Sequence, residues 1–211
     1  NDVAGTLTRN IERSGVRRIR ESAKHIICEN GAVCGVKTES GIIECRAAII
    51  CTGGLSYPLT GSTGSGYKMA QELGHSIVPC HPSLVPLESD DEYCARMQGF
   101  SLKNVTLSAY EDDKLIFREL GEMLFTHFGV SGPLVLSASS HMRNFGKSKY
   151  RLSIDLKPAL DEKKLDARLL RDFEKYANRD FAKSLCDLAG KMMIPVLGEL
   201  SGIPPEEKVN S

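Results

Sequence analysis

A glycine-rich stretch that follows Cys51 carries the clearest chemical signal in the sequence. Ala47–Cys51 is apolar throughout, so we expect a strand buried on both faces, as in a parallel sheet. Gly53 and Gly54 come directly after it. Glycine allows positive φ and lets a ligand approach the backbone, and open α/β sheets bind their ligands at the carboxyl ends of strands. The pattern therefore predicts a ligand site where this strand ends.

The remainder of the stretch favours an anion. Gly61 and Gly64 lead into a helix that we expect from about Ser65 to Leu73, and the free N–H groups at a helix start attract negative charge. The stretch is no Walker loop, because no Lys follows Gly66 in the required place, and no strand runs into G-x-G-x-x-G. From the spacing alone, phosphate or nucleotide binding and a flexible surface loop both remain open.

A second segment gathers hydrogen-bonding groups between aromatic residues. Thr126 and His127 stand shortly before Ser131-Gly132-Pro133, which predicts the start of a helix with Ser131 as its cap and Pro133 in its first turn. The imidazole of His127 is able to donate a proton near neutral pH. In an apolar, aromatic run a histidine is more often a core or capping residue, so the catalytic and the structural interpretation both stand.

The elements that position the first of these segments form a partial α/β domain. Apolar residues at every fourth position predict a helix that is capped by Asp2 and ends at Gly15. A short strand is expected over Val16–Ile19. Asn30-Gly31 between two apolar runs is a strong hairpin signal, because both residues tolerate positive φ. Ile42-Ile43 then leads into a third strand of a small antiparallel sheet.

The composition changes near His81, and a different pattern follows. Alternating apolar residues predict a second antiparallel hairpin that turns at Asp112-Asp113, and residues 152–156 predict a further strand. Three helices are expected: one capped by Asp161, one over Phe181–Leu188 and one over Met192–Leu200. We therefore expect two domains, residues 1–81 and residues 82–211. The second divides into a β unit of about 82–158 and a helical unit of about 159–203.

Charge and composition exclude several classes of protein. Lys and Arg together number 27, as do Asp and Glu, so the formal net charge of +0 predicts no nucleic-acid partner and no anionic membrane surface. A basic cluster from Arg13 to Lys24 lacks aromatic neighbours and is interpreted as a solvated face. No apolar run is long enough to span a bilayer.

The cysteines and the first residues add two further expectations. The seven cysteines form no C-x-x-C pair and no His pair has zinc spacing, so we expect no metal site and reduced thiols in a cytoplasmic protein. The chain opens with Asn1-Asp2 in place of Met and has no signal peptide, which suggests an internal piece of a longer protein.

Several longer strings are more specific than any single spacing. They are Cys51-Thr52-Gly53-Gly54, Gly61-Ser62-Thr63-Gly64-Ser65-Gly66-Tyr67, Pro82-Ser83-Leu84-Val85-Pro86-Leu87, Leu124-Phe125-Thr126-His127-Phe128-Gly129-Val130-Ser131-Gly132-Pro133 and Ile154-Asp155-Leu156-Lys157-Pro158. Together they resemble the BaiN-like flavoproteins, also described as aminoacetone-oxidase-like or NAD(P)/FAD-dependent oxidoreductases. The resemblance covers nearly the whole chain. It departs at Cys51, where Ala is usual, and at Ser65, where many relatives have Asp.

This resemblance implies a fold class of α/β plus α+β. A partial FAD-binding domain of the two-dinucleotide-binding-domain type would be followed by an insert made of an antiparallel, barrel-like β unit and helices. It also implies a flavin-dependent oxidoreductase that uses FAD, with NAD(P)H as a possible electron donor and a small molecule as substrate. The loops that should hold the adenylate and pyrophosphate lie outside this sequence, so we expect the isolated chain to retain little FAD and to be inactive.

The chemistry of particular residues, taken together with the resemblance, gives them expected roles, although the family string by itself gives His127 no role. His127 and Thr126 are the expected catalytic residues. The expected cofactor-binding residues are Thr52, Gly53, Gly54, Ser56, Tyr57, Gly61, Gly64, Ser131 and Gly132. Tyr57 would stack on or hydrogen-bond the flavin, or would pack against Pro58. The alternative function is a non-catalytic module that binds a protein or an RNA. The substrate and the oligomeric state are left open.

Overall fold

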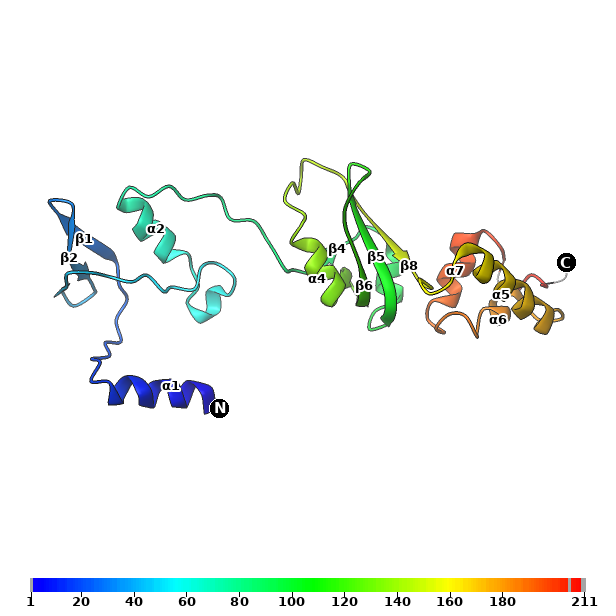
Figure 1. Cartoon of the computed structure of the whole chain (residues 1–211), viewed down its shortest axis with the longest axis horizontal. Coiled ribbons are helices and arrows are strands. Elements are labelled where there is room, and N and C mark those ends of the chain that lie inside the picture. The colour runs from blue at the N-terminus through cyan, green and yellow to red at the C-terminus, as the bar shows by residue number, and fades with distance from the viewer. Residues whose placement is uncertain (1, 205, 210–211) are drawn as a thin grey trace. The chain divides into compact units, whose positions relative to one another are not determined.

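The computed structural model describes residues 2–204 and 206–209. The chain divides into two compact units, and the division falls between Pro79 and Cys80 (Figure 1). Among the described residues, every helix is too short or too polar to cross a membrane.

The first unit begins with an amphipathic helix. Helix α1 spans Asp2–Arg13, and the chain leaves it through Gly15, whose φ is 68°. The expected period is therefore confirmed, but the apolar side chains of Val3 and Leu7 are exposed. The strand expected over Val16–Ile19 is not formed. An extended segment becomes a strand only when a neighbour accepts and donates its backbone hydrogen bonds, and the described residues offer none here.

A three-stranded antiparallel sheet follows, as the hairpin signal predicted. Its strands are β1 (His25–Glu29), β2 (Ala32–Lys37) and β3 (Ile42–Glu44), in the order β1-β2-β3. Asn30 and Gly31 form the turn with φ values of 52° and 79°, the conformation that a tight two-residue hairpin loop requires. The turn chemistry thus set the pairing of β1 with β2 next to the turn, and a register shift between Ile27 and Cys28 changes the pairing beyond it.

The prediction of a buried strand at Ala47–Cys51 is wrong. This segment has no strand partner among the residues that the structure describes, and the side chain of Ile49 is 90% exposed. An apolar run specifies a tendency to be buried, but burial on two faces needs sheet neighbours that the described part of the chain does not supply. The glycine-rich stretch continues through a 3-10 turn (Pro58–Thr60) into helix α2 (Ser65–Glu72), which ends before Gly74 as expected.

The second unit is built on a five-stranded antiparallel sheet. Its strands are β4 (Leu87–Glu88), β5 (Ser101–Glu111), β6 (Lys114–Thr126), β7 (Gly129–Ser131) and β8 (Tyr150–Asp155), in the order β4-β7-β6-β5-β8. Asp112 and Asp113 turn the long β5–β6 hairpin with positive φ, which confirms the predicted hairpin. Alternate residues of β8 are half-buried and exposed, as its sequence pattern predicted.

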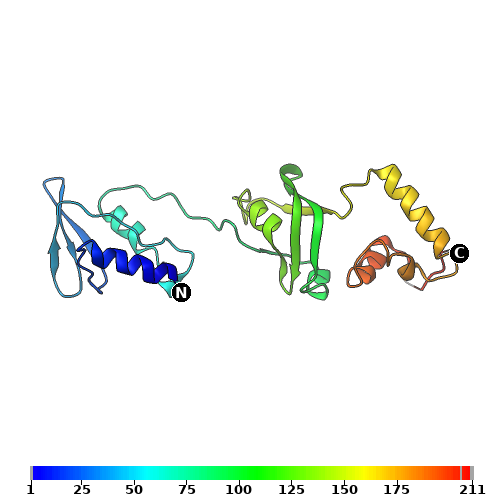
Figure 2. The same cartoon turned by 60° about the horizontal axis from the view of Figure 1, so that its bottom comes forward.

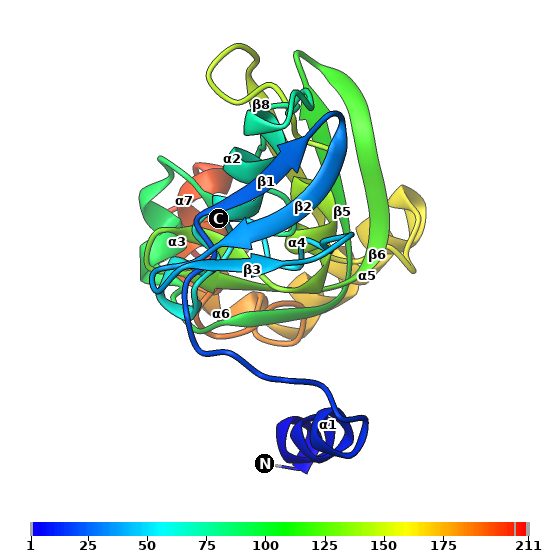
Figure 3. The same cartoon turned by 90° about the vertical axis from the view of Figure 1, so that its left-hand side faces the viewer.

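Two short helices cover this sheet. Helix α3 (Glu92–Arg96) contacts β6 and β7, and helix α4 (Pro133–Ser139) packs along β6 (Figure 2). The core lies between them and the sheet, where Leu107, Met123 and Val135 are almost completely buried. The strands curl around this core into a half-barrel, and the bend of the β5–β6 hairpin is visible in Figure 3. The molecule is thus a mixed α/β protein, while a FAD-binding fold for the first unit stays a prediction.

Three helices follow the half-barrel: α5 (Glu162–Lys175), α6 (Phe181–Ser184) and α7 (Ile194–Ser201). Asp161 caps α5 by accepting a hydrogen bond from the Lys164 backbone N–H at 2.9 Å, as predicted. Helix α6 ends four residues earlier than expected, at Ser184 in place of Leu188, and a turn follows it.

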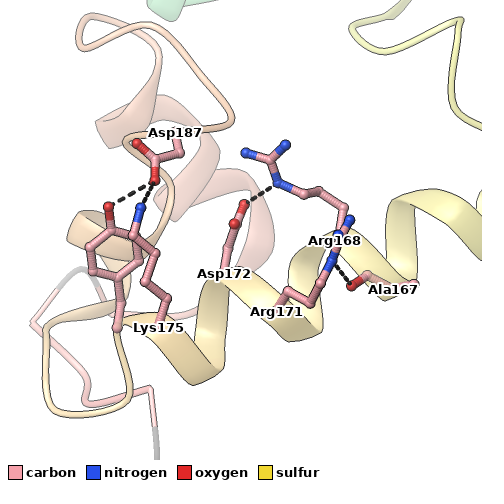
Figure 4. Close-up of polar contacts among 7 residues, drawn as sticks. Ala167, Arg168, Arg171, Asp172, Lys175 and Asp187 are labelled. Atoms are coloured by element: carbon pink, nitrogen blue, oxygen red, sulfur yellow. Dashed lines mark hydrogen bonds and ion pairs between the residues drawn. The ribbon is translucent and has the colours of Figure 1, made fainter.

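Ion pairs join these helical segments. Asp187 accepts hydrogen bonds from Lys175 Nζ at 2.6 Å and from the Tyr176 hydroxyl at 2.8 Å (Figure 4). These two donors hold the pKa of the Asp187 carboxyl below its ordinary value. Within α5, Arg168 Nε donates to Asp172 Oδ2 at 2.8 Å, and this pairing satisfies a carboxylate that is buried. The contacts fix α5 against the loop that follows α6.

Candidate functional site

The glycine-rich loop folds back on itself in the first unit. Gly53 and Gly54 have φ values of 82° and 79°, which residues other than glycine rarely adopt. The Gly64 N–H donates to the Gly54 carbonyl at 2.9 Å, and the Ser62 N–H donates to the Tyr57 carbonyl at 3.3 Å. These bonds close residues 54–64 into a compact loop ahead of α2, so the sequence correctly predicted that the glycines make special backbone turns.

Packing inside the loop explains why glycine is needed at three positions. A Cβ on Gly53 would lie 2.6 Å from Ser62 Oγ, and one on Gly64 would lie 2.7 Å from Leu55 Cδ2. A Cβ on Gly54 would lie 3.1 Å from the Tyr67 hydroxyl. Ser62 in the loop and Tyr67 in α2 therefore pack against these glycines, although no role was predicted for either residue. Their positions inside the glycine-rich string were the signal that could have found them.

The same loop leaves several hydrogen-bond donors free for a ligand. Within the described part of the chain, the backbone N–H groups of Gly53, Gly54 and Leu55 donate to no other protein group. Helix α2 begins after Gly64 without a side-chain cap, so the N–H groups of Ser65 and Gly66 at its start have no partner within the helix. A cluster of free N–H groups beside a helix start is suited to an anion such as a phosphate. The residues present therefore fit a phosphate-bearing cofactor.

The other residues expected at this loop differ in exposure. Thr52 is half-buried, and a Cβ on Gly66 would collide with its side chain, so Thr52 packs against the start of α2. Ser56 is exposed, and Tyr57 is exposed to 73%. A Cβ on Gly61 would meet nothing within 4 Å. Ser56, Tyr57 and Gly61 thus lie on the open side of the loop.

The second candidate segment is a tight hairpin in the second unit. Thr126 ends β6 and pairs with Gly129 of β7, so His127 and Phe128 occupy the turn between them. His127 is exposed and lies edge-to-face with Phe128, with ring centroids 5.0 Å apart. Phe125 is only 3% exposed and belongs to the core, whereas Phe128 is 38% exposed. One aromatic residue therefore anchors the hairpin, and the turn presents His127 to the outside.

Thr126 carries the most informative atom of this hairpin. Its Oγ1 is buried and is the one such side-chain atom among the described residues that has no hydrogen-bond partner. Buried polar atoms are almost always paired, and an unpaired one is costly unless a ligand or water satisfies it. The hydroxyl lies next to the exposed turn at His127 but is closed off from solvent, so a ligand would pair with it only when the turn moves aside.

Ser131 does not cap α4, contrary to the prediction. It is the last residue of β7 and pairs with Leu124 of β6, so its backbone is already committed to the sheet. The cap is Gly132, with φ of 97° and no side-chain cap bond, and Pro133 is the first residue of the helix as expected. A Cβ on Gly132 would lie 2.9 Å from Met123 Cα, so close packing against β6 accounts for glycine here.

The structure thus brings together two separate sets of candidate residues. Thr52, Gly53, Gly54, Ser56, Tyr57, Gly61 and Gly64 share one loop of the first unit, whereas Thr126, His127, Ser131 and Gly132 share one hairpin of the second. Their roles toward a cofactor or substrate stay predictions. A contact between β1 and α2, in which His25 Nδ1 lies 2.8 Å from Glu72 Oε2, was not predicted because the two residues are 47 positions apart.

Known proteins resemble this chain over much of its length. Two curated relatives are named ribosomal RNA dihydrouridine synthase. The Escherichia coli protein is 30% identical over 162 residues, which is 77% of this chain and 38% of the relative. The Haemophilus influenzae protein is 38% identical over 117 residues, which is 54% of this chain and 27% of the relative. A third, the 3-dehydro-bile acid delta(4,6)-reductase of Clostridium scindens, is 27% identical over 157 residues, or 74% of this chain and 38% of the relative.

The chain therefore spans well under half the length of these relatives. Residues 81–211 match the family described as HI0933-like protein barrel and H2TH domain. The half-barrel and the helices that follow it make up this stretch. Since the match covers more than half of the chain, the protein belongs to the HI0933-like family.

Proposed function

We propose that this chain is part of a longer flavin-dependent reductase that hydrogenates a carbon–carbon double bond conjugated to a carbonyl group. The relatives' names support a common reaction of this kind. A dihydrouridine synthase adds two hydrogens to a uridine ring, and a delta(4,6)-reductase of a 3-dehydro steroid acts on double bonds next to a ketone. The finer assignment, to BaiN-like enzymes that hold FAD and take electrons from NAD(P)H, is part of the same proposal.

The unpaired Thr126 hydroxyl is the observation that carries this proposal. In such a reduction the carbonyl oxygen gains negative charge as hydride adds to the far carbon of the double bond. The Thr126 hydroxyl would donate a hydrogen bond to that oxygen, and the exposed His127 would deliver a proton to the other carbon. The reduced flavin, when bound, would supply the hydride. The β6–β7 turn would thus form one wall of the substrate site.

The glycine-rich loop would hold the cofactor. The free N–H groups of Gly53, Gly54 and Leu55, together with the start of α2, offer donors to its phosphate or hydroxyl groups. Ser56, Tyr57 and Gly61 on the open side of the loop would lie along the cofactor, as the resemblance implies.

Flavin occupancy in the longer protein tests the role of the loop. We expect Gly54→Val to lower the flavin absorbance per mole of protein more than it lowers the thermal stability of the apoprotein. Gly74→Val is the matched control, since Gly74 also has positive φ (90°), with nothing within 4 Å of its Cβ position, and lies outside the loop. If both variants lose stability alike and keep their flavin, the glycines serve only the fold.

Turnover tests the role of the hairpin. We expect His127→Ala to retain flavin while kcat falls by about 100-fold, a typical loss for one proton-transfer group. Phe128→Leu keeps an apolar turn beside His127 and is the control for a local packing change. Unchanged turnover in His127→Ala would remove His127 from the reaction.

Ribosomal RNA is a second candidate substrate, because two relatives are named for it. This proposal runs against our expectation from net charge that no nucleic acid binds. The basic cluster offers a surface for a phosphate backbone, since Arg17, Arg18 and Arg20 are exposed. The test compares turnover of the longer protein on ribosomal RNA, free uridine and a conjugated steroid ketone. If RNA is the substrate, Arg17→Glu/Arg18→Glu should lower turnover on RNA, whereas the control Lys163→Glu should not. Turnover of the wild-type protein on RNA at low RNA concentration should also fall steeply as the salt concentration rises.

A further inference from the structure

A groove in the second unit lies apart from both candidate segments. It has a volume of about 580 Å³ and runs between the β5–β8 edge of the half-barrel and the helical segments behind it. Most of its wall is apolar, and several lining side chains are only half-buried although nothing in the described chain fills the space between them. These are Phe100, Leu156, Leu165, Leu169, Leu188 and Leu197.

The groove wall is firmly built. Gly190 lies so close to the ring of Phe100 that a Cβ there would collide with it, which brings the aromatic ring into the wall. The half-barrel side continues into the main core through Leu102 and Val105, both of which are buried. Packed residues thus line the groove on the half-barrel side, and its volume lies in the range of small-molecule sites, about 300–1,000 Å³.

Positive charge gathers at one end of the groove. Strands β5 and β8 are antiparallel, with Thr106 opposite Asp155, so the start of β5 lies beside the end of β8. Lys103 and Lys157 both line the groove at this end. The Asp155 carboxylate, which also lines the groove, accepts a hydrogen bond from the Lys157 backbone N–H at 2.9 Å. The described lining therefore has two basic groups, one acidic group and otherwise no ionisable side chain.

We propose that this groove binds an amphiphilic anion, namely a fatty carboxylate, with its chain among the leucines and its carboxylate between Lys103 and Lys157. Apolar walls with a few polar groups at one place are typical of sites for such ligands. An extended peptide would require backbone hydrogen-bond partners along the groove, whereas this wall is formed mainly by apolar side chains. The proposal is independent of the flavin chemistry, because the groove shares no lining residue with the glycine-rich loop or the β6–β7 turn.

Displacement of a fluorescent anionic probe from the whole chain tests this site. The sequence contains no Trp, so 1-anilinonaphthalene-8-sulfonate is read without interference from tryptophan. We expect dodecanoate, below its micelle concentration, to displace the probe in a saturable way from one site. Each added methylene between octanoate and dodecanoate should tighten binding about fourfold, which corresponds to ~0.8 kcal/mol.

Variants that remove charge distinguish binding at a specific site from nonspecific binding to an apolar surface. Lys103→Gln/Lys157→Gln should weaken dodecanoate binding by at least about tenfold, as expected for loss of a charged hydrogen-bond partner, while binding of the neutral methyl ester stays the same. Lys163→Gln, on the outer face of α5, is the matched control and should change neither. Leu165→Gln/Leu169→Gln should weaken the acid and the ester alike, with urea unfolding confirming that each variant is folded. The proposal would be overturned if dodecanoate did not displace the probe, or if affinity did not depend on chain length. It would also be overturned if Lys103→Gln/Lys157→Gln and the control Lys163→Gln changed dodecanoate binding equally.

Discussion

Replacing Thr126 with Val should stabilise this chain. The Thr126 Oγ1 atom is buried without a hydrogen-bond partner in the described structure, and an unsatisfied buried polar group costs about 1–3 kcal/mol. Val has nearly the same shape, suits a strand, and keeps the backbone pairing of Thr126 with Gly129. We therefore expect the free energy of unfolding to rise by about 1–2 kcal/mol, the lower part of that range because the residue as a whole is only half-buried.

Urea unfolding followed by far-UV circular dichroism measures this change. The midpoint should rise while the slope of free energy against urea stays constant, which shows that stability and not compactness has changed. Thr106→Val is the matched control, because Thr106 is a half-buried residue of β5 whose hydroxyl is not both buried and unpaired. It should change the midpoint by only a few tenths of a kcal/mol. Thr126→Ser keeps the hydroxyl and should give no gain.

The same substitution should have the opposite effect on activity. If the hydroxyl serves a ligand, Thr126→Val in the longer protein lowers turnover while it raises stability, the exchange expected at a functional site. A Thr126→Val chain that is no more stable than wild type, or a gain equal to that of Thr106→Val, would refute the argument that this hydroxyl is held unpaired for a ligand.

Three further changes test the fold. Gly132→Ala should cost at least about 2 kcal/mol, because φ is 97° and the new Cβ would lie 2.9 Å from Met123 Cα; an unchanged urea midpoint would contradict this. Leu107→Ala should cost about 2–5 kcal/mol in the same assay, since Leu107 is 0% exposed. Hydrogen bonds from Lys208 and Lys183 lower the pKa of Asp180 from 3.8 to about 2, so the stability it contributes is complete above pH 4 and is lost as pH falls toward 2. Asp180→Asn should flatten that part of the pH profile, and an unchanged profile would show that the ion pairs do not matter.

The sequence by itself determined the elements whose causes are local. The Asn30-Gly31 turn formed because these two residues accept positive φ, and the Asp112-Asp113 turn did so for the same reason. Asp161 capped its helix because the side chain reaches a free N–H within the same turn. Such interactions involve residues a few positions apart, so the pattern contains all that is needed to predict them.

The glycine-rich loop was predictable as a loop, but its packing was not. The glycine-rich string predicted positive φ at Gly53 and Gly54, and the structure confirms this prediction. That Ser62 and Tyr67 fold back against those glycines depends on the path of the loop. Spacing alone therefore identified the candidate site without identifying the residues that hold its shape.

Tertiary structure alone decided which residues found partners. Ala47–Cys51 has the composition of a buried strand, yet it is no strand here, because pairing requires a neighbour that composition does not specify. Ser131 is of a residue type that often caps helices, yet its backbone pairs with β6 as part of β7 and the residue does not cap α4. The unpaired Thr126 hydroxyl and the groove flanked by Lys103 and Lys157 arise from segments that meet only after folding. The groove is a space between segments, and the Thr126 hydroxyl lacks a hydrogen-bond partner. Both features depend on the whole surrounding chain, so no local sequence pattern predicts them.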